Sequence, residues 1–179
     1  MQEYKIIEDI LNRSSPLLYY KKINIEDIKL EERVSMKCFQ CNKYNKSWTC
    51  PPKIPNIRYE KMFKEYENAV LVYCKISFDD LEDFEYIRRK STNLLHKTLL
   101  KLEAELYKKN FPLATSFIGG SCKLCKDGCA KEECRLPQQA RIPLEATGVN
   151  VLQLFKKSTG IEIIFPPQKV LFRVGLLFW

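Results

Sequence analysis

The sequence predicts an α+β fold organised around a layered sheet. Residues 69–78, AVLVYCKISF, form a nearly continuous apolar and β-branched run, which is typical of a buried central strand. Residues 80–109 follow with leucines and other apolar residues at helical spacing. LATSFI, residues 113–118, then predicts a short second strand, so strand and helix alternate in the middle of the chain.

Ahead of this central unit the sequence predicts a helix, a strand and a second helix. Apolar residues recur at helical spacing over residues 3–12, and the Ser-Ser-Pro that follows ends this helix. Residues 28–36 alternate between apolar and polar side chains, which predicts a strand leading into Cys38. Residues 57–67 again have a helical pattern.

The strand, long helix and strand at the centre predict a right-handed parallel crossover. Asp79 and Asp80 are suitable N-cap residues for the long helix, and Pro112 is expected to end it.

The last part of the chain predicts short helices and two strands. The helices are expected near residues 143–147 and 150–159, each followed by a glycine, Gly148 or Gly160, of the kind that ends helices. Strands are expected near residues 161–165 and 169–178. The order β-α-β, then α-β-β, predicts a ferredoxin-like α/β sandwich with its helices on one face of the sheet.

We expect a single domain over residues 1–179, because this length is enough for one ordinary hydrophobic core. Its expected parts are an N-terminal helix and extension (1–30), a first cysteine loop (31–56), an α-β-α-β core (57–118), a second cysteine loop (119–141) and a C-terminal α-β-β segment (142–179).

Charge and hydropathy narrow the function classes. The formal net charge is +8, but basic residues alternate with acidic ones along the chain, so nucleic-acid binding is not favoured. The basic excess instead favours an acidic partner protein. The start of the chain lacks the pattern of a secretory signal, and the apolar run VGLLFW is far shorter than the roughly 20 residues of a membrane span. The sequence therefore predicts a cytoplasmic protein without a membrane span.

Seven of the eight cysteines fall into two groups, which predicts metal binding because structural disulfides are rare in the cytosol. We name Cys122, Cys125, Cys129 and Cys134 the second cysteine group. Their C-x2-C-x3-C-x4-C spacing supplies four thiolates on one loop, and Gly128 allows a tight bend there. This compact arrangement favours a [4Fe-4S] cluster over zinc, because zinc ribbons pair two C-x2-C units across a longer hairpin.

The first cysteine group consists of Cys38, Cys41 and Cys50 and lacks a fourth thiol. Its fourth ligand could be Cys74, Cys134 exchanged from the second group, or a substrate or solvent molecule. Four protein thiolates suit electron transfer, whereas an open iron permits binding of a substrate. Cys74 lies in the middle of the predicted central strand, and plain core packing is the favoured interpretation of it over ligation.

Four residues near the two groups are candidates for supporting a metal centre. Arg135 and Arg141 could stabilise an anionic cluster or bind an anionic substrate, or form ordinary ion pairs. Tyr44 and Trp48 could shield a cluster from water, stack on a substrate, or only anchor their loop.

Two further residues have simpler interpretations. His96, the sole histidine, adjoins the apolar stripe of the long helix and is expected not to be a ligand. Glu145 is expected to be an acid in the first turn of a helix. Nucleotide-binding and serine-hydrolase motifs are absent from the sequence.

Two stretches of the sequence resemble a known family. CFQCNKYNKSWTCPP and CKLCKDGCAKEECRLPQQARIPLEATGVNV are similar to the predicted metal-binding proteins of domain-of-unknown-function family 2284, and the resemblance covers about residues 30–178. It implies metal or iron-sulfur binding in an anaerobe, with no established reaction. Glu145 and Gly148 match the family pattern, whereas Asn150 replaces an acidic residue.

The leading functional hypothesis is an iron-sulfur redox protein that transfers one electron at a time with one or two [4Fe-4S] clusters. A first alternative is an enzyme whose three-cysteine site has an open iron for a small sulfur- or oxygen-bearing substrate. A second is an interaction domain stabilised by zinc. The sequence leaves open whether the protein is an enzyme.

Overall fold

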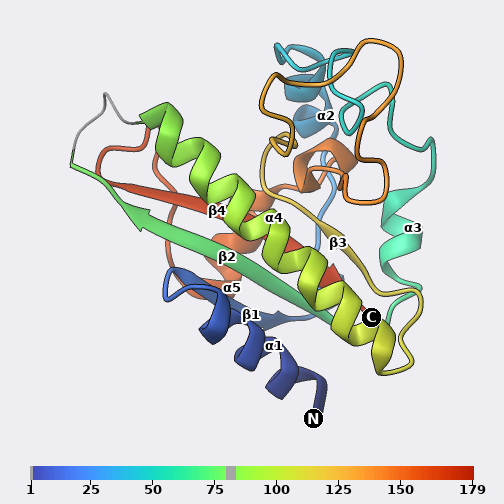
Figure 1. Ribbon diagram of the computed structural model, residues 1–179, viewed down its shortest axis with the longest axis vertical. Helices are drawn as coiled ribbons and strands as arrows, with labels where there is room; N and C mark the ends of the chain where they lie inside the picture. The colour runs from blue at the N-terminus through green and yellow to red at the C-terminus, as the bar shows by residue number, and fades with distance from the viewer. Residues whose placement is uncertain (1, 80–83) are drawn as a thin grey trace.

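The computed structural model describes residues 2–79 and 84–179, and its centre is a four-stranded sheet (Figure 1). The strands are β1 (Leu18–Ile23), β2 (Ala69–Ser77), β3 (Thr115–Phe117) and β4 (Val170–Phe178). Their order is β1-β2-β4-β3, and every neighbouring pair is antiparallel. The mixture of this sheet with helices confirms the α+β class.

The long helix α4 (Phe84–Lys108) connects β2 to β3 as expected, but the two strands are not neighbours. Both are antiparallel to β4, so β2 and β3 run in the same direction with β4 between them. The residues of β4 explain its central place, because Val174–Phe178 are buried and require cover on both faces. A ferredoxin-like core stays a prediction.

One face of the sheet is covered by α4 and by α1 (Gln2–Ser14), which pack beside each other in Figure 1. Every second residue of β2 points to these helices, so that its side chains join the leucines of α4 in one core. The residues of β2 in this core are Val70, Val72, Cys74 and Ile76. The periodicity that predicted the long helix therefore corresponds to a real buried stripe.

The opposite face is also covered, so the expectation of helices on one face only was wrong. The other side chains of β2, including Leu71 and Tyr73, pack against α3 (Tyr59–Phe63), α5 (Val151–Thr159) and the short 3-10 helix η2 (Leu144–Thr147). A continuous apolar run such as that of β2 requires cover on both faces, since each face of the strand has large apolar side chains.

Two predicted strands are absent from the described residues. Residues 28–36 instead contain a single bridge at Leu30 and the start of helix α2 (Glu32–Phe39). Leu30, Val34 and Cys38 are four residues apart, a spacing that fits a helix as well as alternation fits a strand. Residues 161–165 likewise form no strand.

The prediction also missed β1, which pairs with β2 through the register Tyr20 to Val72. A short 3-10 helix, η1 (Ile25–Asp27), follows it. The basic and tyrosine-rich sequence of β1 has little apolar alternation because this edge strand is mostly exposed. A strand of this kind is identified by its backbone pairing, which a single sequence does not reveal.

The remaining helices are confirmed with shifted bounds. α1 extends the predicted 3–12 by one to two residues, α3 is shorter than the predicted 57–67, and the predicted start of the long helix at Asp80 lies outside the described residues. Gly148 and Gly160 end η2 and α5 in the left-handed conformation, as expected. Asn150 caps α5, because its side chain accepts a hydrogen bond from the backbone N–H of Gln153 at 3.1 Å.

The second cysteine loop leaves and rejoins the fold at one point. Ile118 donates its N–H to the carbonyl of Ile142 at 3.0 Å and accepts from the N–H of Leu144 at 2.8 Å. Directly after Ile118, the backbone of Gly119 lies against β4, where an added Cβ would be 2.5 Å from the carbonyl oxygen of Val174. The loop therefore begins where only glycine allows the chain to approach the sheet so closely.

Replacing Gly119 should consequently destabilise the fold through a backbone clash. We expect Gly119→Ala to lower the free energy of unfolding by about 3 kcal/mol, because the opposing atoms belong to the backbone of β4 and cannot rotate away. Denaturant unfolding followed by circular dichroism measures the change. Gly160→Ala is the control: its surroundings are open, and only its left-handed conformation costs about 1 kcal/mol. An equal loss in the two variants would contradict the clash.

Candidate metal centre and adjoining cleft

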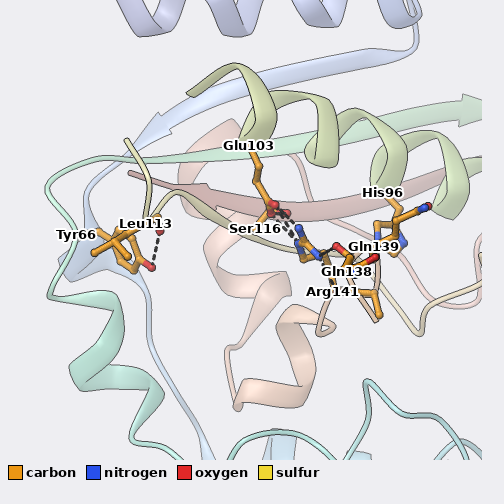
Figure 2. Close-up of polar contacts among 9 residues, drawn as sticks. Tyr66, His96, Glu103, Leu113, Ser116, Gln138, Gln139 and Arg141 are labelled. Carbon is orange, nitrogen blue, oxygen red and sulfur yellow. Dashed lines mark hydrogen bonds and ion pairs between the residues drawn. The ribbon is translucent and has the colours of Figure 1, made fainter. Parts of the chain in front are cut away.

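One face of α4 holds the second cysteine loop through three polar side chains seven residues apart. Arg89 donates to the carbonyl of Cys125 at 2.9 Å, and His96 is hydrogen-bonded through Nε2 to the carbonyl of Gln139 at 2.8 Å. Glu103 forms an ion pair with Arg141 (Figure 2), whose Nε donates to Oε1 at 2.8 Å. Seven residues are two helical turns, so the three anchors lie along one line of the helix.

The Glu103–Arg141 pair is only slightly exposed, with 11% of the glutamate side chain and 22% of the arginine side chain accessible. Arg141 also donates to the carbonyls of Gln138 and Ala140, and Ser116 of β3 donates to Glu103 (Figure 2). Arg141 therefore ties the end of the second loop to α4 and to the sheet.

His96 is buried and uncharged in its role as an anchor. Since Gln139 contributes a carbonyl, Nε2 carries the proton and Nδ1 is the unprotonated nitrogen. Burial lowers the pKa of His96 below its usual value, an effect only partly opposed by the hydrogen bond to Gln139. These contacts give His96 a structural role, and its expected absence from the ligand set stays a prediction.

The two cysteine loops lie side by side at one end of the molecule, near α2 in Figure 1. Trp48 of the first loop donates from Nε1 to the carbonyl of Ala130 in the second, at 2.8 Å. Ser47 lies beside Cys129, with 3.8 Å between Oγ and Sγ. Trp48 is thus a bridge between the loops, while Tyr44 packs edge-on against Phe39 at a centroid distance of 5.0 Å.

The second cysteine group converges on one small cavity. All four of its cysteines line this cavity, together with Trp48, Thr49, Leu124, Gly128, Leu136 and Ala140. Burial raises the pKa of Cys122, and the neighbouring thiols of its own group raise it further. Four thiols around one cavity are a soft donor set that a bound cation would stabilise.

The first cysteine group converges in the same way at the end of α2. Burial raises the pKa of Cys38 to about 11, and Glu145, Cys50 and Cys41 raise it in that order. Burial also raises the pKa of Cys50, with smaller effects from Cys41 and from Cys129 of the second group. The two groups are therefore near neighbours in space, although more than seventy residues separate them in the sequence.

The thiols are gathered but do not form a preformed metal cage. Across residues 2–79 and 84–179, no three or more Cys, His, Asp or Glu side chains are spaced so that they could hold a metal ion. The donor chemistry suits zinc or iron with sulfide, since both prefer thiolates.

Cys74 belongs to the hydrophobic core, and Cys122 of the second cysteine group packs against the same core. Cys74 is fully buried in the core between β2 and α4, and burial raises its pKa to about 11. The charged groups that affect its pKa are Arg173 and Lys90, with no contribution from another cysteine. These contacts favour the packing interpretation over ligation.

Arg135 has a modest local contact. Its Nη1 donates to the carbonyl of Gly128 at 3.2 Å, within the bend between Cys125 and Cys129. It therefore supports the backbone of the second loop from the exposed side.

The first cysteine group opens onto a broad cleft, which we name the basic cleft, of about 1170 Å³. Its charged lining is mainly cationic, with six basic residues against the two carboxylates Glu85 and Glu145. The basic residues are Lys37, Lys43, Arg88, Arg89, Lys123 and Arg173.

Glu145 and Lys123 lie inside the basic cleft in strongly altered surroundings. Burial raises the pKa of Glu145. This rise is opposed by the hydrogen bond that Glu145 accepts from the N–H of Gly120 at 3.3 Å and by the charges of Arg173 and Lys123. Burial lowers the pKa of Lys123 to about 8, and Arg173 lowers it further. Perturbed acids and bases beside a cleft are typical of functional sites.

Sequence reasoning missed most of this cleft. Glu145 does lie in the first turn of η2, as expected, but its place in the cleft was not predicted, and Lys123 and Arg173 were not singled out. A signal for Arg173 is present, because it is the one charged residue in the apolar strand VLFRVGLLF. A charge within a buried strand is costly unless it faces a cavity or partner.

Together the fold and this site define an α+β protein with two groups of cysteines gathered at one end of its sheet. Residues 21–178 match the family described as predicted metal-binding protein (DUF2284), and the chain belongs to this family. No curated protein and no solved structure matches the chain. Across the described part of the chain, none of the helices is apolar over a length that would cross a membrane.

The His96 anchor should make the stability of the protein depend on pH. Because folding lowers the pKa of His96, the unfolded chain takes up a proton first as the pH falls below about 6.5. Stability is complete above that value and is lost as the pH falls toward the lower pKa of the folded state. Denaturant unfolding at pH 7.5 and 5.5 measures this loss.

The variant His96→Leu separates this effect from other titrations. At pH 7.5 it should unfold more easily by about 1–3 kcal/mol, because the buried Gln139 carbonyl loses its donor. It should also lose less stability than the wild type between pH 7.5 and 5.5. Lys97→Gln, on the exposed side of α4, is the control and should behave like the wild type. An identical pH dependence in all three proteins would rule out His96 as the cause.

Proposed function

We propose that this protein is a cytoplasmic iron-sulfur protein that transfers single electrons. The observation that carries the proposal is the convergence of the four thiols of the second cysteine group on one cavity. Four thiolates on a short loop suit a [4Fe-4S] cluster, which exchanges one electron without moving protein atoms far.

The surrounding residues have definite roles under this proposal. The anchors on α4 fix the loop backbone at Cys125 and near Gln139, so that the thiols stay close together during loading. Trp48 covers the cavity and joins the two loops, which limits access of water. Both burial and hydrogen bonds tune the potential of such a centre.

A second cluster at the first cysteine group would lie close to the first. The influence of Cys129 on the pKa of Cys50 supports this nearness. Two adjacent centres would give an electron a path from the basic cleft to the second cavity. We propose an acidic protein as the electron partner, because the lining of the basic cleft is mainly cationic.

A second candidate function is an enzyme with an open iron at the first cysteine group. The positions of Cys74 in the core and of Cys134 in the second cavity favour it, since neither lines the basic cleft with Cys38. The opening of this group onto the basic cleft leaves space for a small ligand there. When bound, an iron with a free position supplies Lewis acidity to such a ligand.

Metal analysis tests the proposal directly. Protein purified without oxygen should contain about four or eight irons per chain with equal sulfide, and a visible absorption band that decreases on reduction. About two zinc ions per chain with no sulfide would refute electron transfer and leave the third hypothesis, an interaction domain stabilised by zinc.

Single cysteine variants then assign the ligands. Cys134→Ala should lose the iron and sulfide of one centre, because its thiol lines the second cavity. Cys74→Ala should keep the full metal content and lose only about 1 kcal/mol of stability or slightly more, because it removes one buried sulfur atom. Iron and sulfide assays with denaturant unfolding measure both effects. Loss of a centre in Cys74→Ala would contradict the core interpretation and provide the first group with its fourth ligand.

A further inference from the structure

A second cavity adjoins the basic cleft and has the opposite character. It encloses about 680 Å³ between α2, α5 and β4, and we name it the apolar pocket. Eight of its seventeen lining residues are aliphatic or aromatic: Val34, Val149, Val151, Leu152, Ile163, Phe165, Phe172 and Val174. Its volume is within the range of pockets for small organic ligands.

The apolar pocket and the basic cleft share part of their walls. Lys37, Glu145, Phe165 and Arg173 line both. The two spaces therefore meet at a boundary where charged and aromatic side chains stand together. A single molecule could extend across this boundary, with a charged end in the cleft and an apolar body in the pocket.

Arg173 is positioned to bind an anion at this boundary. Its Nε donates to the hydroxyl of Ser91 at 3.3 Å, and its Nη1 lies beside Gly120, 3.7 Å from where a Cβ would be. Among the ion pairs of the described residues, none includes Arg173. The guanidinium end is thus fixed by its neighbours, while its charge has no direct carboxylate partner among the residues that the structure describes.

Lys123 adds a second cation on the same wall. Its ammonium group donates to the carbonyl and hydroxyl of Ser121, at 3.1 and 3.2 Å, and it forms no ion pair within the described part of the chain. Glu145, which also lines the basic cleft, accepts a hydrogen bond from the N–H of Gly120. Within residues 2–79 and 84–179, neither of these half-buried cations has a carboxylate within ion-pair distance, and such a pair of cations suits an oxyanion.

We propose that the basic cleft and the apolar pocket together bind an organic oxyanion, a carboxylate or a phosphate, that carries an apolar body. Arg173 and Lys123 hold the oxyanion, and the side chains around Leu152 and Phe165 cover the apolar body. This inference goes beyond electron transfer and does not require a particular metal. It places the charged end of the ligand in the same cleft as Cys38, Cys41 and Cys50.

A competing explanation is that the cations only balance the charge of a metal centre. A four-iron cluster with four thiolates carries about two negative charges in its common oxidised state. That explanation accounts for cations in the cleft, but it gives no reason for an apolar pocket that adjoins them. The two explanations also differ in what the removal of Arg173 should do to metal content.

Calorimetric titration of the protein as purified, with its metal, tests the proposal. The probes are octanoate and octyl phosphate, compared with acetate, which lacks the apolar body, and octylamine, which reverses the charge. We expect one or both of the first two to bind, and the comparison between them identifies the oxyanion. Acetate and octylamine should bind at least about tenfold more weakly.

Variants locate the site, with metal content measured for each. Arg173→Gln and Lys123→Met should each weaken binding of the preferred probe by about tenfold or more while keeping the metal. Leu152→Asn should weaken it several-fold, since this half-exposed side chain lines only the apolar pocket. Lys101→Met, an exposed lysine on α4 that lines neither space, is the control and should bind as the wild type does.

Three results would overturn the inference. The first is that neither octanoate nor octyl phosphate binds, and the second is that octylamine binds as tightly as they do. The third is loss of metal in Arg173→Gln and Lys123→Met, which would assign these cations to the metal centre. Failure of the electron-transfer proposal is distinct, because zinc in place of iron and sulfide would leave the expected binding of octanoate or octyl phosphate unchanged.

Discussion

The contact between the polar line of α4 and the second cysteine loop is the constraint on which the site depends. Arg89, His96 and Glu103 hold a long loop without regular structure against a helix that is itself fixed by the sheet. Each side chain satisfies a backbone carbonyl or an arginine that would otherwise lie half-buried without a partner. Through Trp48 the same loop positions the first one, so that one face of a single helix orders both cysteine groups.

This dependence explains why so much of α4 is neither apolar nor exposed. The helix has a core stripe that packs on the sheet and, beside it, a polar line that packs on a loop. A polar line buried against a loop is costly unless every buried donor and acceptor is paired. Among the described side chains, two buried acceptor atoms have no hydrogen-bond partner, Nδ1 of His96 and Oδ1 of Asn93. Specific pairing of this kind fixes one loop path among many, which apolar packing alone would not do.

The sequence predicted what local patterns determine. The central strand, the long helix, the glycine-capped helices and the two cysteine groups follow from periodicity, capping and spacing, which act over a few residues. It did not predict β1, the insertion of β4 between β2 and β3, or the second covered face, because these depend on pairing between distant segments. The same limit applies to the site: the cysteines are evident from their spacing, but Arg173 joins Glu145 and Lys123 only after β4 enters the sheet.

The hydrogen bonds at the base of the second cysteine loop allow the loop to change in length during evolution without a change in the sheet. Because Ile118 is bonded to both Ile142 and Leu144, the loop leaves the sheet and returns at adjacent positions. The sheet register is then independent of how many residues lie between them, and a longer loop adds only a small entropic cost, about 0.6 kcal/mol for each doubling of length. Ligand spacing within the loop can therefore change by insertion or deletion while the scaffold below it stays the same.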